Sequence, residues 1–267
     1  MKAPFLVDTH AHLVDKRLSA ELPAVLARAA AAGVVQVVSI ATGAEDSRKI
    51  LAMAREYPGV FAAVGIHPND VAEAAPDDWS VIEELARESR VVAIGETGLD
   101  RYWKKTPFED QQASFARHLR LAFDLFLPIV IHSRDCMGNI IDQLEGLGRP
   151  VKGVLHSFTG TWSEAERLVE LGLSISFAGM LTFANKSLNP LRDAARQVPE
   201  DRLLLETDSP YLSPEPFRGK LNEPARVLET AKRLAEVRGV SLESIAERTT
   251  ANARRLFGLP ESGDRLG

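Results

Sequence analysis

The 267-residue chain has little or none of several features that mark large classes of protein. Its single cysteine, Cys136, cannot form an internal disulfide, which suits a reducing cytosol. No apolar run approaches the roughly 20 residues that a membrane-spanning helix needs. The apolar run before Asp8 is too short for the core of a signal peptide. We therefore expect a cytoplasmic protein that does not enter a membrane.

Sequence motifs of several familiar catalytic classes are missing as well. The chain has no Gly-x-Ser-x-Gly elbow of a serine hydrolase, no P-loop, and no glycine-rich phosphate loop after an early strand. Positive charge is not in excess either, because the net charge is −5. An acidic total argues against non-specific coating of nucleic acid, but it does not exclude a local basic pocket.

Eight short apolar runs, rich in Val, Ile and Leu, alternate with longer amphipathic stretches. Nearly continuous apolar runs are typical of parallel strands that are buried on both faces. The alternation predicts a single α/β domain over residues 1–267, a TIM (β/α)8 barrel with its core at about 5–258 and a frayed polar tail at 259–267. The predicted strands are Phe5–His12, Val34–Ala41, Val60–His67, Val91–Glu96, Pro128–His132, Lys152–His156, Leu173–Phe177 and Arg202–Asp208.

Helix-like segments lie between and after the predicted strands. Ala20–Ala32 stops at Gly33, and glycine commonly ends a helix with positive φ. Ser163–Leu171 opens with Ser163 and has Glu166 three residues later, the pattern of a capping box. The other predicted helices are Pro107–Phe126, Asn222–Arg238 and Ser241–Phe257.

Five of the six histidines lie where a predicted strand ends. His10 and His12 are two residues apart, so their side chains point to the same face of the first strand. The carboxylates Glu96 and Asp208 end the fourth and eighth strands in the same way. In a TIM barrel, the C-terminal ends of all strands face one crater, which is where we expect the functional site. The other three histidines at strand ends are His67, His132 and His156.

These residue types point to a metal site. Imidazole is a very common metal ligand, and burying two carboxylates without a cation would be costly. The set suits Zn²⁺, Mn²⁺ or a similar divalent ion, and it has more ligands than one tetrahedral Zn²⁺ needs. We predict two divalent ions (Zn, Mn or Mg) bridged by Glu96, with Asp208 as general base toward a water made acidic by the metal. The predicted ligands are His10, His12, Glu96, His132, His156 and Asp208.

Each of these residues, taken singly, has an ordinary structural alternative. A histidine at a strand end is more often hydrogen-bonded and partly buried than a ligand, and a carboxylate there often caps a helix. The prediction of a metal site therefore depends on all the histidines and carboxylates at the strand ends taken together. Chance placement of five of six histidines at strand ends is improbable, and the His-x-His pair adds a shared direction.

Other polar residues near the predicted crater are candidates for substrate contact or for support of the ligands. His67 is predicted to bind a substrate oxyanion, with stabilisation of the turn before Pro68 as the alternative. Arg134 is predicted to hold a phosphate through its guanidinium fork, with an ion pair on the outer rim as the alternative. Glu206 shares the face of Asp208, where it would either hydrogen-bond to a ligating histidine or form a structural salt bridge.

Two loops combine basic and aromatic residues close to the predicted crater. The loop Arg101–Lys105 follows the fourth strand, and its composition suits a nucleic-acid strand through charge and base stacking. Arg218 and Lys220 follow the eighth strand, and loops after the late strands of a barrel often bind phosphate. Arg218 is therefore a third candidate for substrate contact. The alternative for both loops is a solvated surface without a ligand.

Several motifs, in order along the chain, resemble the TatD family of metal-dependent deoxyribonucleases, which belongs to the amidohydrolase-like metal barrels. The resemblance runs from about Val7 to Phe257, and Ser157 departs from the cysteine more usual there. It implies a TIM barrel with two divalent metals, the six ligands named above, and hydrolysis of DNA phosphodiesters, including exonuclease action. The motifs are Asp8-Thr9-His10-Ala11-His12, Gly95-Glu96-Thr97-Gly98-Leu99-Asp100, His132-Ser133-Arg134, His156-Ser157-Phe158-Thr159-Gly160, Glu206-Thr207-Asp208-Ser209-Pro210, Arg218-Gly219-Lys220-Leu221-Asn222-Glu223-Pro224 and Asn252-Ala253-Arg254-Arg255-Leu256-Phe257.

The residues and the resemblance together predict a metal-dependent DNase, a monomer or weak oligomer with DNA as its substrate. One alternative is a hydrolase of a small ester, amide or lactone on the same barrel, because fold and metal ligands serve many substrates. The acidic total charge favours this alternative, whereas the basic loops favour the nuclease. A protein that binds metal without catalysis is a further alternative, and the complete ligand set with a candidate base argues against it.

Overall fold

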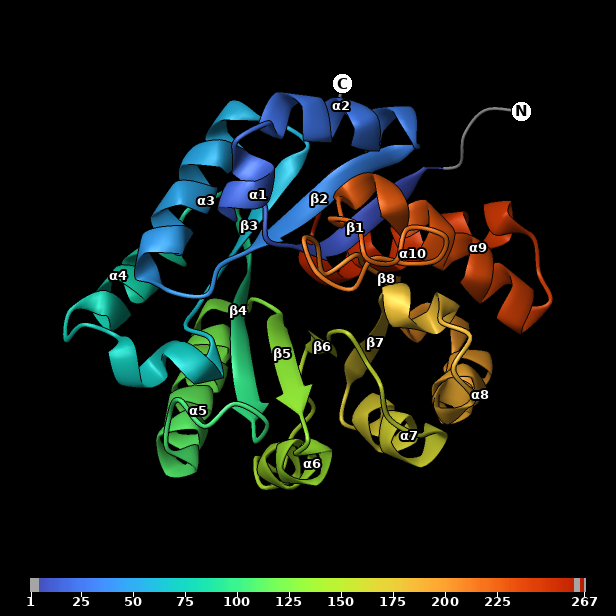
Figure 1. The fold of residues 1–267 in the computed structure, drawn as a ribbon. Coiled ribbons are helices and arrows are strands. Elements are labelled where there is room, and N and C mark those ends of the chain that lie inside the picture. The colour runs from blue at the N-terminus through green and yellow to red at the C-terminus, as the bar shows by residue number, and fades with distance from the viewer. Residues whose placement is uncertain (1–4, 262–264, 267) are drawn as a thin grey trace.

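The computed structural model describes residues 5–261, 265 and 266. Eight strands form one parallel sheet in the order of the sequence, wound into a barrel (Figure 1). The predicted TIM-barrel fold is confirmed. The strands are β1 Leu6–Ala11, β2 Val34–Ile40, β3 Val60–Val64, β4 Val91–Asp100, β5 Ile129–Arg134, β6 Gly153–Leu155, β7 Leu173–Phe177 and β8 Leu203–Leu205.

Helices surround the barrel on its outer side (Figure 1). Within the described part of the chain, no helix is both long and apolar enough to cross a membrane. The α-helices are α1 Lys16–Ser19, α2 Leu22–Ala31, α3 Ala44–Glu56, α4 Asp78–Leu85, α5 Phe108–Leu125, α6 Met137–Glu145, α7 Trp162–Glu170, α8 Asn189–Gln197, α9 Val227–Arg238 and α10 Leu242–Phe257. The 3-10 turns are η1 Pro68–Glu73, η2 Gly179–Thr182, η3 Lys186–Leu188, η4 Glu200–Arg202 and η5 Pro224–Arg226.

The strand sequences explain why the barrel wall is inaccessible to solvent. Every residue of β1, β2, β3 and β4 is buried, as expected for strands covered by side chains inside the barrel and by helices outside. Valine and isoleucine dominate these strands, and their branched side chains pack well on a pleated surface. The polar residues among them, such as Asp8, His10 and Glu96, are buried too. Because burial of unpartnered polar groups is costly, each must have a specific partner.

Strand β4 continues past its predicted end at Glu96 to Asp100, and it pairs with β5 over this extension. The pairing continues from Thr97 opposite Ile131 to Asp100 opposite Arg134. Gly98 allows this close approach, because a Cβ at that position would lie 2.2 Å from the carbonyl oxygen of His132. The extended pair places Asp100 and the loop that follows it beside the C-terminal end of the barrel.

The barrel closes between β8 and β1 through loop residues. The Asp208 N–H donates to the His10 carbonyl oxygen at 2.9 Å, and the His12 N–H donates to the Ser209 carbonyl oxygen at 2.7 Å. The buried Asp8 carboxylate accepts hydrogen bonds from the backbone and hydroxyl of Thr207, at 2.9 and 2.6 Å. These contacts bring Asp208 to the same place as the two histidines that end β1.

Helix α7 begins differently from the prediction. Its capping box is formed by Thr161 and Glu164, not by Ser163 and Glu166. The backbone of Thr161 is extended, and the helix starts at Trp162, so Ser163 already lies within the first turn. Two serine or threonine residues in nearby positions make such a shift easy to miss from sequence.

The fraying predicted for Glu261–Gly267, within the polar tail at 259–267, is wrong at Leu266, a residue that the structure describes. Leu259 is buried, and Leu266 is buried with its N–H donating to the Val35 carbonyl oxygen at 2.8 Å. Apolar side chains therefore hold this segment against the barrel. Residues 262–264 and 267 lie outside the described residues.

Candidate metal centre

Glu96 lies at the centre of the predicted cluster, and its two carboxylate oxygens face different histidines. Oε2 lies 3.3 Å from His10 Nε2 and 3.7 Å from His12 Nε2. Oε1 lies 3.0 Å from His132 Nδ1 and 2.9 Å from His156 Nε2. One side chain at the end of the barrel thus faces two pairs of imidazoles, one pair on each oxygen.

Asp208 lies on the Oε2 side of Glu96. Its Oδ1 is 3.7 Å from His10 Nε2 and 3.5 Å from His12 Nε2. The ligand atoms of His10, His12 and Asp208 lie within 4.8 Å of one another, as a single ion requires. The structure therefore brings together all six residues that the sequence predicts as ligands.

Carboxylates behind His132 and His156 determine which ring nitrogen carries the proton. His132 Nε2 lies 3.1 Å from Asp100 Oδ2, and His156 Nδ1 lies 3.2 Å from Glu206 Oε1. When each ring is neutral, as it must be to bind a metal ion, the outer nitrogen donates to the carboxylate and the nitrogen that faces Glu96 carries a lone pair. This is the tautomer that a metal ligand requires. Glu206 lies where the sequence predicts a partner for a ligating histidine.

The two histidines that end β1 face Glu96 through the same ring atom. His12 Nδ1 donates to the Ile40 carbonyl oxygen at 3.2 Å, which leaves the lone pair on Nε2, the atom that faces Glu96 and Asp208. The buried Nδ1 of His10 has no hydrogen-bond partner among the described residues, so no contact at Nδ1 fixes the tautomer of this ring. With the proton on Nδ1, the inward Nε2 carries the lone pair that a metal ligand needs.

His67 has the opposite tautomer. Its Nδ1 accepts a hydrogen bond from the Asn69 N–H at 3.1 Å, which puts the ring proton on Nε2. That Nε2 points toward Glu96 Oε1, at 3.7 Å. Burial lowers the pKa of His67 to about 3, so the ring is neutral at physiological pH. Distance alone would group His67 with Glu96 and His132 as ligands, but its inward nitrogen is a donor and not a lone pair.

The electrostatics and the donor set fit a divalent cation. Burial raises the pKa of Glu96, but attraction to the His156 and His10 rings in their protonated forms outweighs burial and holds that pKa well below the usual range. An ionised, buried carboxylate that faces several imidazole lone pairs needs a positive charge among them. Nitrogen and carboxylate oxygen donors together are the ligands of Zn²⁺ and Mn²⁺. The residues present therefore suit such ions.

Asp100 is the residue that the sequence interpretation missed. It belongs to a motif quoted above, but no role is predicted for it because β4 is expected to end at Glu96. In an extended strand, residues four apart point to the same face, so a longer β4 would have drawn attention to Asp100. Burial opposes its ionisation, but hydrogen bonds from His132 and its neighbours hold its pKa below the usual range.

The structure does not direct the two predicted arginines at the cluster. The guanidinium of Arg134 lies over the ring of Tyr102, 3.6 Å from its centroid, and that of Arg218 lies over Phe183 at 4.1 Å. Both arginines are exposed, and within the described residues neither forms a hydrogen bond or ion pair with the cluster. Stacking on a neighbouring ring satisfies the guanidinium, and this preference is not visible in sequence.

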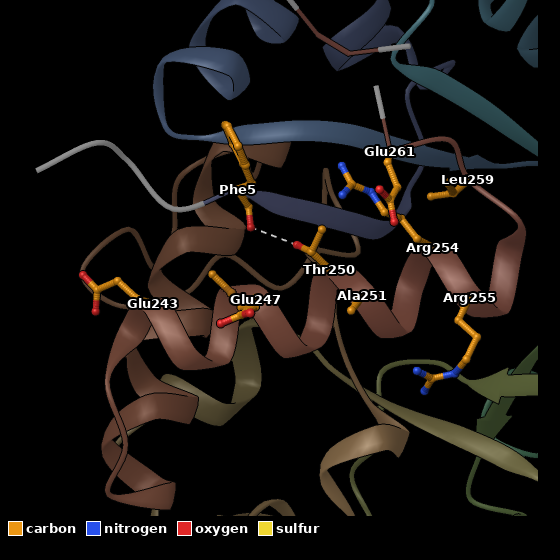
Figure 2. Close-up of a pocket in the computed structure, with 10 residues that line it drawn as sticks. Phe5, Glu243, Glu247, Thr250, Ala251, Arg254, Arg255, Leu259 and Glu261 are labelled. Atoms are coloured by element: carbon orange, nitrogen blue, oxygen red, sulfur yellow. Dashed lines mark hydrogen bonds between the residues drawn. The ribbon is translucent and has the colours of Figure 1, made fainter. Parts of the chain in front are cut away.

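A cavity of about 570 Å³ lies away from the cluster, beside α10 (Figure 2). Phe5, Thr250 and Arg254 are among its lining residues, and Thr250 donates to the Phe5 carbonyl oxygen at 2.8 Å. None of the predicted ligands lines it. Its size is therefore no reason to move the candidate site from the strand ends.

The barrel and its cluster of histidines and carboxylates define a metal-dependent hydrolase. Residues 7–258 match the family model described as TatD related DNase, and the chain belongs to this family. It is 39% identical to the uncharacterized metal-dependent hydrolase YabD of Bacillus subtilis (strain 168), covering 94% of this chain and 98% of that protein. It is 35% identical to the 3'-5' ssDNA/RNA exonuclease TatD of Klebsiella pneumoniae (strain 342), covering 97% of this chain and 100% of that protein.

A solved structure shows the same likeness. The TatD homologue YjjV from Escherichia coli K12 superposes with a TM-score of 0.89 at 34% sequence identity. The superposition covers 96% of this chain and 98% of that one. Because both chains are covered almost entirely, the likeness extends over the whole barrel.

Proposed function

We propose that the protein is a divalent-metal-dependent nuclease that hydrolyses DNA phosphodiester bonds, acting as an exonuclease. The main observation in support is that the two carboxylate oxygens of Glu96 face different pairs of histidines. Each of these oxygens faces two inward imidazole nitrogens that can carry a lone pair, 2.9–3.7 Å away. Two-metal sites of nucleases hold their ions on either side of a phosphate, and a carboxylate divided in this way can be shared by both ions.

Two ions would share Glu96. His10, His12 and Asp208 would hold one ion on the Oε2 side, whereas His132 and His156 would hold the second on the Oε1 side. When bound, the ions supply Lewis-acid polarisation of the phosphate and make water acidic enough to attack at neutral pH. This arrangement leaves the second ion with fewer protein ligands and hence with room for substrate.

Asp208 is the proposed general base. Burial raises its pKa, but the hydrogen bond that His12 donates when protonated and attraction to His10 and His156 outweigh burial, so the pKa lies below the usual range. The carboxylate is therefore ionised at neutral pH and able to accept a proton from the attacking water. Its side chain keeps 14% of its surface exposed, which is enough for contact with water in the crater.

His67 is the proposed donor to the substrate. The proton on its inward Nε2 suits a hydrogen bond to a non-bridging phosphate oxygen, whose negative charge grows in the transition state. The low pKa of the ring keeps it a neutral donor at physiological pH. Arg134 and Arg218 remain proposed phosphate contacts, and each would have to leave or extend from its present aromatic ring to reach the substrate.

The proposed DNA substrate is supported by the name of the Klebsiella relative, a 3'-5' ssDNA/RNA exonuclease, and by the basic, aromatic loop beside the site. The test is hydrolysis of end-labelled oligonucleotides by the purified chain with Mg²⁺, Mn²⁺ or Zn²⁺. We expect stepwise shortening from one end, loss of activity with EDTA, and recovery when excess metal is restored.

A parallel panel of phosphotriesters and lactones tests the alternative function. No shortening of DNA with any of the three ions would contradict the proposal. Turnover of a lactone or another small ester in the same preparation would then establish a small-molecule hydrolase, and the acidic net charge would agree with that result.

A further inference from the structure

The loop after β4 presents two aromatic rings to solvent beside the candidate metal centre. Tyr102 is 51% exposed and Trp103 is 49% exposed, although large apolar rings usually avoid water. Their ring centroids are 4.9 Å apart in an edge-to-face arrangement. Such exposure beside a candidate active site is typical of a surface that binds a flat partner.

Positive charge surrounds these rings. Arg134 lies over the Tyr102 ring, with its guanidinium 3.6 Å from that centroid and 5.8 Å from the Trp103 centroid. Lys104 and Lys105 follow directly, both exposed, and neither forms an ion pair of 4 Å or less with another described residue. A cavity of about 440 Å³ opens beside Trp103 and the two lysines. The loop therefore combines faces for stacking with charges that suit phosphates.

The loop is fixed relative to the metal ligands. The Asp100 Oδ1 accepts the N–H groups of Tyr102 and Trp103 at 2.8 and 2.9 Å, while its Oδ2 faces His132 Nε2 at 3.1 Å. Gln111 holds both ends of the loop, because its Nε2 donates to the carbonyl oxygens of Asp100 and Thr106. One carboxylate thus supports a ligand of the centre and the backbone beneath the exposed rings.

We propose that Tyr102, Trp103, Arg134, Lys104 and Lys105, here called the β4 platform, bind single-stranded nucleic acid. One or more bases stack on the two rings, and the lysines contact the adjacent phosphates. The two faces of a base are free in a single strand and covered in a duplex, so the platform selects the single strand. This inference rests on the proposed nuclease function, and it adds the residues that recognise the strand.

The test measures the affinity of the full-length chain for fluorescein-labelled pentathymidylate by anisotropy, with EDTA present to prevent turnover. We expect the double variant Tyr102→Ala/Trp103→Ala to bind about 5- to 150-fold more weakly for each stacked base that it no longer holds. The double variant Tyr102→Phe/Trp103→Phe retains both rings and should bind within about twofold of the wild type. Asp100 accepts its hydrogen bonds from backbone N–H groups, which both variants retain, so the loop should stay in place.

Two controls separate stacking from a general loss of structure. Phe126 is 86% exposed at the end of α5, away from the loop, and Phe126→Ala should bind the strand as the wild type does. A blunt-ended hairpin, whose duplex stays paired at the assay temperature, should bind more weakly than the single strand and equally in the wild type and Tyr102→Ala/Trp103→Ala. An equal weakening for strand and duplex would overturn stacking as the mode of binding.

The lysines are tested separately by the salt dependence of the affinity. Lys104→Ala/Lys105→Ala should reduce the slope of log affinity against log salt by about 0.7 for each lysine that binds a phosphate in the wild type. An unchanged slope would remove the lysines from the platform.

Hydrolysis of methyl 4-nitrophenyl phosphate distinguishes failure of the platform from failure of the proposed function. This phosphodiester lacks a base, so Tyr102→Ala/Trp103→Ala should lower its hydrolysis far less than it lowers the affinity for pentathymidylate. Wild-type affinity of that variant for pentathymidylate would overturn the platform even if DNA is cleaved. Absence of oligonucleotide binding by the wild type would overturn it as well, whereas the proposed chemistry is judged by hydrolysis alone.

Discussion

The two sides of Glu96 differ in where their other negative charge lies. On the Oε2 side, the Asp208 carboxylate faces His10 and His12 directly. On the Oε1 side, Glu96 is the only carboxylate among the predicted ligands that faces His132 and His156. Instead, Asp100 and Glu206 lie behind the two imidazoles, His132 and His156, one behind each.

Because the further carboxylates lie in different places on the two sides, one shared carboxylate, Glu96, can contribute to two unlike ion sites. An ion on the Oε2 side would have four protein ligands, two of them anionic, and should bind tightly. An ion on the Oε1 side would have three, and its affinity would depend on imidazoles made more basic by the carboxylates behind them. We therefore expect a firmly bound ion beside Asp208 and a weaker ion, open to substrate, beside His132 and His156.

The largest expected effect comes from the residue that both sides share. Glu96→Ala removes a ligand from each ion, and Lewis-acid stabilisation of several kcal/mol corresponds to a loss of about 10³-fold or more in kcat. Metal analysis of the dialysed protein should show that both ions are weakened together. Full turnover by this variant would contradict the assignment of the centre.

A substitution on the Oε2 side should separate that side from its neighbour. Asp208→Asn removes the proposed base and one anionic ligand, and we expect kcat to fall by about 10²- to 10⁴-fold. The Oε1 side should keep its ion at saturating metal, because its ligands are untouched. If Asp208→Asn released both ions equally, the two sides would not be independent.

Substitutions behind the Oε1 side should have smaller effects that are confined to that side. Asp100→Asn and Glu206→Gln each weaken the orientation of one histidine, which typically costs about 10- to 100-fold in metal affinity or activity. Titration with Mn²⁺ should show the loss in the weaker of two binding steps. Asp193→Asn, which removes an exposed carboxylate paired with Arg196, is the matched control and should change neither step.

The smallest effect on activity is expected at His118, the one histidine that does not face Glu96. It is buried in α5, and its Nε2 accepts the Ile66 N–H at 3.0 Å. Burial lowers its pKa from 6.5 to about 4. The unfolded chain therefore takes up a proton at a higher pH than the folded chain, and stability present above pH 6.5 is lost as the pH falls toward 4.

Removal of His118 should make stability less sensitive to acid. Between pH 7 and pH 5, the free energy of unfolding of His118→Gln should fall by about 2 kcal/mol less than that of the wild type. Urea unfolding in EDTA at the two pH values measures this difference without a contribution from bound metal. Equal losses in the two proteins would show that His118 is not held neutral by its surroundings.

The sequence was sufficient for the barrel and for the meeting of the six predicted ligands. Regular apolar runs define parallel strands, and the C-terminal ends of such strands must share one end of the barrel. Residues such as His10 and Asp208, though 198 positions apart in the chain (208 − 10), are brought together by this rule alone. The rule needs the location of each strand end only to within a few residues, since β8 ends at Leu205 and not at the predicted Asp208.

Features that depend on particular contacts could not be predicted in the same way. The extension of β4 to Asp100 depends on Gly98, which lets the strand approach the His132 backbone. The direction of Arg134 depends on the ring of Tyr102, and the packing of Leu266 depends on the Val35 carbonyl oxygen. Each is a tertiary contact between residues whose own sequence neighbourhood gives no sign of the partner.

The most direct test of the account is the number and position of the ions around Glu96. We would grow crystals of the full-length chain with Mn²⁺ and collect anomalous diffraction data. We expect two peaks about 3.5–4 Å apart. One should lie beside Asp208 on the Oε2 side of Glu96, and the second beside His132 and His156 on the Oε1 side. A single peak at saturating Mn²⁺, or two peaks on the same side of Glu96, would contradict the account.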